Sequence, residues 1–168
     1  VMKSAIFYFS LDGSARCAAE ALSRKWAADV IELAEAKPRG RGKWDFVKAV
    51  FQALRGAESR LALNVSDAAR PYDKVYIISP VWAGRTVPAV NACLAQCDFT
   101  GKQVGILSVQ ADRDLKGADE VLDSMARRVE AARGQVVFRH ALVGALPGKT
   151  ISREDMERQI NEIFDDVR

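Results

Sequence analysis

Apolar runs of strand length alternate along the chain with longer stretches in which apolar residues recur every three or four positions. The runs are rich in β-branched and aromatic residues, which fit a pleated and buried surface. They predict five β-strands, at residues 4–9, 29–33, 74–79, 102–109 and 135–143. The third run, KVYIIS, is apolar almost throughout, as expected for a central strand that is buried on both faces of a parallel sheet.

The remaining periodic stretches predict five amphipathic helices. The first begins near Ser14, and the last opens at Ser152, where Asp155 completes a capping-box pattern. The second covers residues 44–56 and carries an apolar stripe formed by Trp44, Val47, Phe51 and Leu54. The most regular is the fourth, whose expected inner face consists of Ala118, Val121, Leu122, Met125, Ala126 and Val129.

Strands that alternate with helices predict an α/β fold with one doubly wound parallel sheet and helices on both faces, because right-handed crossovers return the chain to the same sheet. With 168 residues and 49% hydrophobic content, we expect a single domain over residues 1–168. Ligands of such sheets bind at the carboxyl ends of the strands, where the strand order reverses. The loops after the first, third and fourth strands are therefore where a binding site is expected.

Composition narrows the class of protein. The 25 Lys and Arg against 22 Asp and Glu leave a formal charge of +3, which falls short of the basic surface of a nucleic-acid-binding protein. No apolar stretch approaches membrane-spanning length, and no leader pattern precedes the first strand. The 3 cysteines contain no C-x-x-C pair, so no disulfide framework and no metal site is predicted. We expect a cytoplasmic protein with no nucleic-acid or membrane partner.

The loop after the first strand runs directly into a helix and reads Ser10, Leu11, Asp12, Gly13, Ser14, Ala15. A helix N-terminus offers free backbone N–H groups and the positive end of its dipole, which together bind phosphate. Gly13 permits close approach of the backbone, and the hydroxyls of Ser10 and Ser14 add donors. The alternative is that Asp12 or Ser14 only caps the helix, which is the commoner role for such residues.

Two further loops lead to a family resemblance. The third strand ends in SPVWAGRTVPAV and the fourth in LSVQADRD. Together with the first loop, with YDKVYIISPVWAG and FTGKQVGILS, they resemble the flavodoxin family over most of the chain. That resemblance implies strand order 2-1-3-4-5 and FMN as cofactor, with its phosphate on Ser10 to Ala15. It also implies an isoalloxazine ring between two loops, one formed by Pro80, Val81, Trp82, Ala83 and Gly84, and the other by Ser108, Val109 and Gln110.

The first loop departs from the family pattern Ser/Thr-x-Thr-Gly-Asn-Thr. Asp12 and Ala15 stand where threonines are usual, and Ser14 replaces asparagine. A carboxylate within about 4–6 Å of a phosphate dianion repels it. Two arrangements remove the conflict: Asp12 offers its backbone N–H while its side chain faces solvent, or it pairs with Arg16 one helical turn later. Without either, the resemblance would describe a domain that has lost its cofactor.

Several other sequence features give weaker evidence about function. GALPGKT, residues 144–150, has one residue too few between its glycines for a phosphate-binding P-loop and is interpreted as a tight connection to the last helix. The loop at residues 35–43 carries several cations and is expected to be exposed, with docking of an acidic partner as the alternative. Cys93 and Cys97 fall on an apolar helix face and are interpreted as core residues. His140 is the only histidine in the sequence, so neither a metal site nor a hydrolase triad is predicted.

The leading functional hypothesis is an FMN-binding, flavodoxin-like redox protein. It would be an electron-transfer protein or a small flavin-dependent oxidoreductase, with a redox protein or a small-molecule electron acceptor as partner. Dedicated electron carriers of the family tend to be acidic, so the mildly basic charge weakens the carrier hypothesis and leaves a small reductase or a carrier with an acidic partner. The alternative is a flavodoxin-like domain without FMN that acts as a binding or regulatory module. A phospho-acceptor receiver is disfavoured, because the third strand ends in Ser79-Pro80 instead of an aspartate. The oligomeric state is left open.

Overall fold

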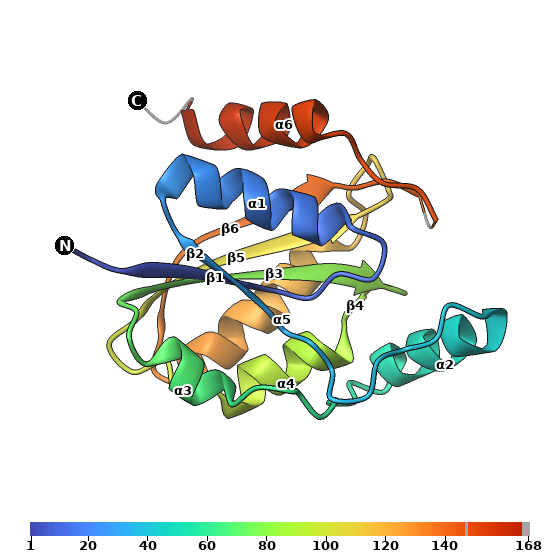
Figure 1. Cartoon of the computed structure of the whole chain (residues 1–168), viewed down its shortest axis with the longest axis horizontal. Coiled ribbons are helices and arrows are strands. Elements are labelled where there is room, and N and C mark those ends of the chain that lie inside the picture. The colour runs from blue at the N-terminus through green and yellow to red at the C-terminus, as the bar shows by residue number, and fades with distance from the viewer. Residues whose placement is uncertain (147, 166–168) are drawn as a thin grey trace.

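A computed structural model describes residues 1–146 and 148–165 and contains the predicted parallel sheet (Figure 1). Its strands lie side by side in the order β2 (Asp29–Glu32), β1 (Ser4–Tyr8), β3 (Lys74–Trp82), β5 (Gln103–Gln110) and β6 (Gln135–Val143). Each pair along this path is parallel. The predicted strand order is therefore confirmed. One short strand was not predicted: β4 (Arg85–Thr86) turns back antiparallel on the end of β3.

Helices cover both faces of the sheet (Figure 1). On one face lie α1 (Ser14–Trp26) and α6 (Arg153–Asp165). On the other lie α4 (Pro88–Gln96), α5 (Ala118–Ala131) and a short helix, α3 (Val65–Ala69), which is not among the five predicted helices. The remaining helix, α2 (Lys43–Leu54), extends to the side of these layers, beyond the carboxyl ends of the strands. None of the described helices is both long and apolar enough to cross a bilayer.

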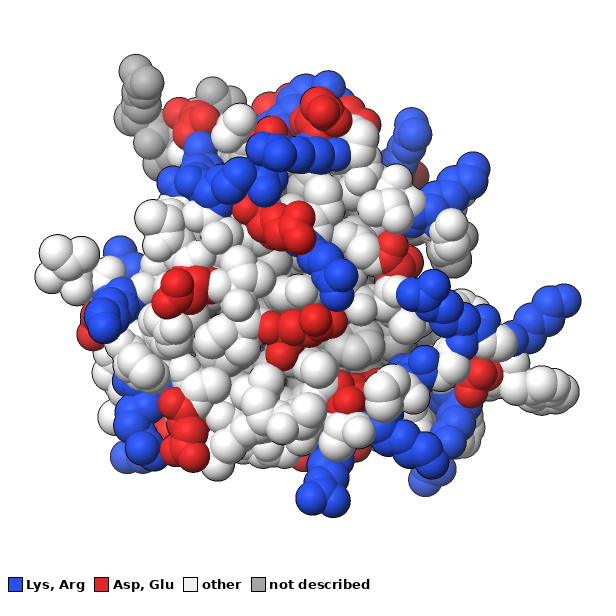
Figure 2. Space-filling view, in the orientation of Figure 1, with Lys and Arg blue, Asp and Glu red and all other residues white. Residues whose placement is uncertain are grey.

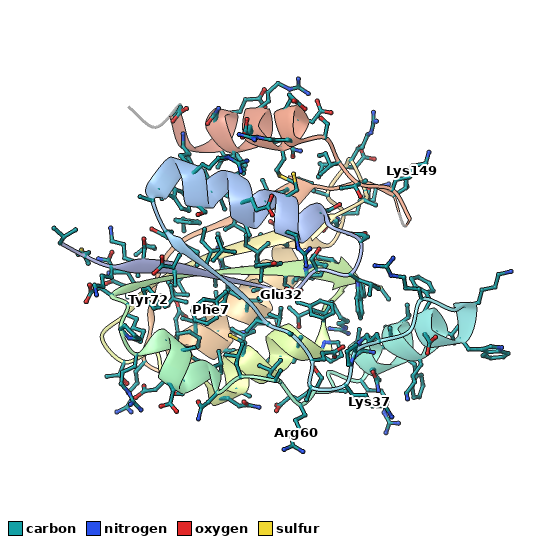
Figure 3. All side chains as sticks on the ribbon, in the orientation of Figure 1. Phe7, Glu32, Lys37, Arg60, Tyr72 and Lys149 are labelled. Carbon is teal, nitrogen blue, oxygen red and sulfur yellow. The ribbon has the colours of Figure 1, made fainter. Side chains whose placement is uncertain are left out.

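Two apolar clusters hold the layers together, one on each face of the sheet. Along β1, Phe7 packs into the cluster shared with α4 and α5, whereas Ile6 packs into the cluster shared with α1 and α6. Figure 3 shows Phe7 on the side of the sheet that α4 covers. All six residues predicted for the inner face of α5 are buried, and so are Cys93 and Cys97. These sequence predictions are confirmed.

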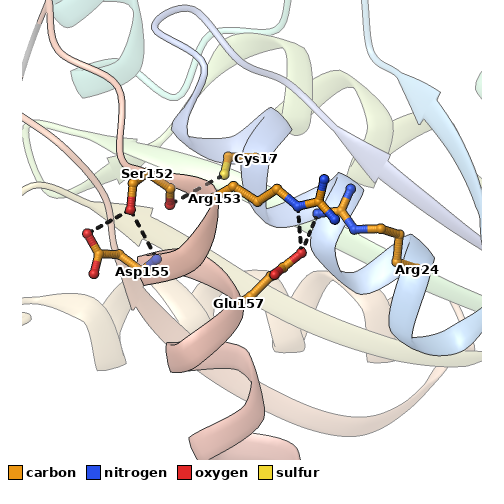
Figure 4. A network of polar contacts seen from close by, with 6 residues as sticks. All are labelled: Cys17, Arg24, Ser152, Arg153, Asp155 and Glu157. Atoms are coloured by element: carbon orange, nitrogen blue, oxygen red, sulfur yellow. Dashed lines mark hydrogen bonds and ion pairs between the residues drawn. The ribbon is translucent and has the colours of Figure 1, made fainter.

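Polar contacts join α6 to α1 at its first turns (Figure 4). The hydroxyl of Ser152 accepts a hydrogen bond from the backbone N–H of Asp155 at 3.1 Å, so the predicted cap is present. The carboxylate of Glu157 lies 2.8 Å from Arg24 and 2.9 Å from Arg153, and these arginines lower its pKa. This pairing anchors the start of α6 beside α1, which places the β6–α6 connection next to the β1–α1 loop.

The helix predicted at residues 44–56 is present, but its apolar stripe is not packed against the protein. Only Ala49 and Ala53 of α2 are buried. The exposed fractions of Trp44, Val47, Phe51 and Leu54 are 85%, 56%, 56% and 53%. A 3.6-residue period shows that one face of a helix is apolar, and it carries no information about what covers that face.

Candidate functional site

A cavity of about 600 Å³ opens at the carboxyl ends of β1, β3 and β5, the edge of the sheet where the sequence predicted a site. Nine of the predicted site residues line it: Leu11, Asp12, Ser14, Pro80, Val81, Trp82, Ala83, Val109 and Gln110. The other five belong to the same three loops but do not line this cavity: Ser10, Gly13, Ala15, Gly84 and Ser108.

The β1–α1 loop is held by hydrogen bonds from its own side chains. The hydroxyl of Ser10 accepts from the backbone N–H of Gly13 at 3.0 Å. The carboxylate of Asp12 accepts from the backbone N–H of Ser14 at 3.1 Å. Gly13 itself has a φ of 100°, a left-handed conformation that favours glycine. Asp12 therefore acts as a local cap on the first helical N–H group, which is the alternative that the sequence left open.

The arrangement of Asp12 differs from both that were expected. Its carboxylate engages the loop backbone instead of facing solvent alone, and no described residue supplies it with a salt bridge. Arg16 instead pairs with Glu32, with Nη2 3.2 Å from Oε1. Arg16 also lies against Tyr8, whose pKa is raised by burial despite this cation. The helix geometry turns Arg16 toward β2, away from the loop.

The connection between β6 and α6 braces this loop. The backbone N–H of Ala145 donates to the hydroxyl of Ser14 at 3.2 Å. The hydroxyl of Thr150 donates to the backbone carbonyl of Asp12 at 3.1 Å. Gly144, Ala145, Gly148 and Thr150 line the cavity. The segment GALPGKT is thus more than a connection to the last helix, although Pro147 within it lies outside the described residues.

Two backbone N–H groups at the start of α1 make no hydrogen bond with the described residues. The first backbone bond of the helix runs from Cys17 N–H to the Gly13 carbonyl. Within the described part of the chain, the backbone N–H groups of Ala15 and Arg16 have no acceptor. Such groups at a helix N-terminus, with the helix dipole behind them, are suited to an anion.

The second wall of the cavity is built around Trp82, which the β3–β4 turn holds in place. Ala83 and Gly84 both have positive φ, 50° and 71°, as a tight hairpin turn requires. The rings of Phe9 and Trp82 form a T-shaped pair, with 5.8 Å between their centroids and an interplanar angle of 79°. The guanidinium carbon of Arg39 lies 5.6 Å from the Trp82 centroid, within the range of a cation–π contact.

The third wall is the end of β5. Gln110 is 8% exposed, and its Nε2 donates to the backbone carbonyl of Lys116 at 3.0 Å. Its Oε1 is buried and has no hydrogen-bond partner among the described residues. An acceptor buried without a partner costs about 1–3 kcal/mol, so this atom is a candidate for contact with a ligand N–H or O–H group.

Sequence reasoning missed the wall formed by residues 39–50. Arg39, Arg41, Phe46 and Val50 line the cavity, although this region was expected to be an exposed loop followed by a packed helix. Arg39 is nearly buried, with Nε 2.7 Å from Oε2 of Glu35. One sequence feature could have indicated how this segment turns into α2, namely Asp45 three residues after Gly42. The Asp45 carboxylate accepts a hydrogen bond from the backbone N–H of Gly42 at 3.2 Å and fixes the turn.

Comparisons with known proteins agree with this geometry. Residues 3–153 match a family model described as flavodoxin. A protein from Bacteroides uniformis classed as a flavoprotein is 20% identical, with a TM-score of 0.73 over 95% of this chain and 98% of its own. A flavoprotein from Lactobacillus acidophilus in complex with FMN is 16% identical, with a TM-score of 0.64 over 84% and 93%.

A third structure, the Fusobacterium nucleatum flavodoxin bound to flavin mononucleotide, is 14% identical, with a TM-score of 0.54 over 100% of both chains. At these identities the likeness concerns the fold. None of the curated proteins compared matches the chain in sequence.

Proposed function

The chain belongs to the flavodoxin family, and from that premise we propose that it binds FMN in the cavity at the carboxyl ends of β1, β3 and β5. We infer that it works as an electron-transfer protein or as a small flavin-dependent reductase. The observation that carries the proposal is the buried Oε1 of Gln110, an acceptor without a partner among the described residues, at a cavity that the aromatic side chain of Trp82 also lines.

The ring end of the cavity fits a flavin. The cavity volume of about 600 Å³ lies within the usual range for small-molecule sites, roughly 300–1,000 Å³. Trp82 offers an aromatic surface whose position is fixed by Phe9 and Arg39. The pyrimidine edge of a flavin carries an N–H donor beside carbonyl acceptors, which is the polarity that the Gln110 side chain requires.

The start of α1 offers N–H donors to a phosphate, but the carboxylate of Asp12 opposes its charge. The N–H groups of Ala15 and Arg16 are available for phosphate oxygens, whereas the N–H of Ser14 is taken by Asp12. A phosphate that contacts the Ser14 N–H must first displace the Asp12 carboxylate, and the two anions repel each other if both remain close. FMN binding is therefore expected to be weakened, but not prevented, by Asp12.

FMN, when bound, supplies reversible transfer of one or two electrons. The residues of this chain would do the rest: the start of α1 would hold the phosphate, Trp82 and Val109 would exclude water from the ring, and Gln110 would bind its polar edge. The cation of Arg39 lies beside Trp82 at the cavity wall and favours added negative charge there, although Glu35 offsets part of its field. The electrons would pass to a redox protein or a small-molecule acceptor at the cavity mouth.

The second candidate is a flavodoxin-like module without FMN, and the Asp12–Ser14 hydrogen bond is the observation that favours it. In that case the carboxylate permanently replaces the phosphate as the acceptor at the start of α1. This candidate leaves the buried Oε1 of Gln110 without a role.

Reconstitution separates the two candidates. The purified protein is incubated with excess FMN, desalted, and examined by visible absorption. Retained flavin with a structured spectrum supports the proposal, and subsequent photoreduction distinguishes one-electron from two-electron behaviour. The absence of retained flavin, together with no quenching in a fluorescence titration, would favour the module without cofactor.

A further inference from the structure

The side of α2 that is turned away from the cavity is apolar and exposed. The buried residues of the helix are Ala49, which lines the cavity, and Ala53. Four apolar side chains on the opposite side are more than half exposed and are here called the apolar stripe: Trp44, Val47, Phe51 and Leu54. Because an α-helix turns by about 100° per residue, these four project within an arc of about 80°. Contiguous exposed apolar surface of this kind marks an interaction site.

Cations border the apolar stripe on both sides. By the same helical rotation, Lys43 lies about 20° outside one edge of the stripe, and Arg55 and Lys48 lie about 20° and 40° outside the other. None of the three forms a salt bridge with another described residue. The guanidinium carbon of Arg55 lies 5.3 Å from the centroid of the Phe51 ring. Side chains of this kind bury their stems along apolar surface and keep their charges at its border.

The single acidic residue near the stripe does not lie on it. Asp45 is the only carboxylate in residues 41–57, and it accepts the backbone N–H of Gly42 at the start of the helix. Arg41 adds a fourth cation two residues before the helix. Figure 2 shows that Lys and Arg outnumber Asp and Glu over this part of the molecule, at the lower right of the view. A surface that covers the stripe must accept apolar side chains at its centre and offer negative charge at both edges.

An anionic lipid bilayer has this combination of properties, because its hydrocarbon lies directly beneath a layer of negatively charged headgroups. We propose that α2 is a membrane-docking helix, which lies along the surface of an anionic bilayer with the apolar stripe inserted between the lipids. The cations of Lys43, Lys48 and Arg55 then lie at the level of the headgroup phosphates. Trp and Phe, which the stripe contains, are side chains that suit this boundary between water and hydrocarbon.

Membrane docking of this kind requires no membrane-spanning segment. The expectation from sequence of no membrane partner rested on the lack of a long apolar stretch, which a helix in the interface does not need. Such a helix is identified by an apolar face and a basic polar border, and its length does not decide the matter. The docking side is opposite to Ala49 and the cavity, and it needs no bound FMN. The proposal can therefore hold or fail independently of the proposed function.

Two other occupants of the stripe account for fewer of these features. A second copy that paired its α2 with this one would bring Lys43, Lys48 and Arg55 of both copies together, and like charges repel. An acidic protein would match the charges. However, the stripe is a narrow convex ridge on a helix that extends to the side of the layers (Figure 1), and a rigid partner needs a matching groove to pack against it. A fluid bilayer adapts to such a ridge.

The first test is co-sedimentation of the full chain, without added flavin, with lipid vesicles at low ionic strength. Vesicles of phosphatidylcholine alone are compared with vesicles of phosphatidylcholine and phosphatidylglycerol in equal parts. The chain should bind the anionic vesicles at least about tenfold more strongly. Added salt should weaken this binding, because ions screen the attraction between the headgroups and the cations of α2.

Two double variants separate the apolar contribution from the charged one. Trp44→Ser with Phe51→Ser removes two inserted rings and should lower the partition coefficient for anionic vesicles at least about tenfold. Lys43→Gln with Lys48→Gln should lower it about fivefold per cation, or roughly 25-fold together. All four side chains are exposed, so circular dichroism and thermal unfolding of both variants should match the wild type.

A matched control makes the same change in net charge elsewhere. Lys3→Gln with Arg127→Gln removes two exposed cations, one just before β1, at the end of the sheet opposite to the cavity, and one on α5. This variant should bind anionic vesicles as the wild type does. A loss equal to that of Lys43→Gln with Lys48→Gln would show that only the overall charge matters, and it would overturn the assignment to α2.

The fluorescence of Trp44 reports insertion of the stripe itself. This side chain is 85% exposed, so its emission should shift to shorter wavelength and its quenching by acrylamide should fall when anionic vesicles are added. Trp44→Phe keeps an aromatic ring in the stripe and should still co-sediment. Most of the spectral change should nevertheless disappear in this variant, because the other two tryptophans, Trp26 and Trp82, are already partly buried in the protein.

Three results would overturn the proposal. A wild-type chain that does not bind the anionic vesicles leaves the stripe to a protein partner. Binding that persists unchanged in both double variants of α2 uses another surface. A wild-type chain that sediments as a dimer, and that Trp44→Ser with Phe51→Ser converts to monomers, has its stripe covered by a second copy.

Discussion

The carboxylate of Asp12 and the backbone N–H of Ser14 form a hydrogen bond, with 3.1 Å between Oδ1 and N, at the start of α1. The same end of the helix is where a flavin phosphate would bind. A side-chain anion thus already uses one of the first donors of the helix, and it leaves those of Ala15 and Arg16. The charge of Asp12, more than its size, should decide how strongly a phosphate is held there.

Replacing that charge while keeping the hydrogen bond tests this expectation. Asp12→Asn retains an acceptor for the Ser14 N–H but removes the repulsion of a phosphate dianion. We expect FMN affinity to rise about fivefold or more, which corresponds to about 1 kcal/mol. Riboflavin, which lacks the phosphate, should bind the variant and the wild type equally. The measurement is the dissociation constant of each flavin by fluorescence quenching.

A different pattern in this experiment would assign Asp12 another role. If FMN and riboflavin both bind Asp12→Asn more weakly, the carboxylate organises the loop and does not oppose phosphate.

Replacing Gln110 should lower the affinity for flavin but change the stability of the flavin-free protein only slightly. Gln110→Met keeps the length of the side chain, and it removes both the buried, unpartnered Oε1 and the Nε2 bond to the Lys116 carbonyl. These effects have opposite signs, so the unfolding free energy of the flavin-free protein should change by less than about 1 kcal/mol. Affinity for FMN and for riboflavin should fall together, since the lost contact is to the ring. An unchanged affinity for both flavins would remove Gln110 from the site.

Trp82 should contribute to binding through its aromatic surface. We expect Trp82→Ala to weaken FMN about tenfold or more, because stacking and the burial of a large ring are lost together. Trp82→Phe is the matched control and should retain most of the affinity, since Phe9 and Arg39 can still position a ring there. Titration of both variants with FMN measures the difference. Equal affinities for Ala and Phe would show that no ring stacks at this position.

The strands and the helices of the two layers were predictable because burial imposes a period on the sequence. The inner face of α5 and the apolar run of β3 are surrounded by protein on every relevant side, so their patterns map directly onto packing. The short strand β4 has only two residues and no period to read, and its turn is set by the positive φ of Ala83 and Gly84.

The candidate site was predictable to the extent that topology determines it. Parallel strands bring the loops of β1, β3 and β5 to one edge, which is why nine predicted residues line one cavity. The walls contributed by residues 39–50 and by Thr150 depend on how distant segments fold back, and no local pattern specifies that. The orientation of α2 was unpredictable for a related reason: the face opposite Trp44 packs through two small alanines, Ala49 and Ala53.

The buried thiols of Cys93 and Cys97 should make the folded protein less stable as the pH rises into the alkaline range. Burial raises the pKa of Cys97 from 9.0 to about 11, and burial also raises the pKa of Cys93. In the unfolded chain these thiols ionise near pH 9, while in the folded protein they stay neutral to higher pH. The folded state then binds more protons than the unfolded state, so stability is intact below pH 9 and is lost as the pH rises toward 11.

Removing the Cys97 thiol should therefore flatten the alkaline limb of the stability curve. Cys97→Ala keeps a small apolar side chain at a site that is 4% exposed, so at pH 7 only a modest loss from the cavity is expected. Between pH 9 and 11 the variant should lose less stability than the wild type, by on the order of 2 kcal/mol. Urea unfolding at a series of pH values measures this, and Cys17→Ala, at a partly exposed position, serves as the control with a smaller change. Parallel pH curves for Cys97→Ala and the wild type would show that the Cys97 thiol ionises equally easily in both states, and hence that water reaches it in the folded protein.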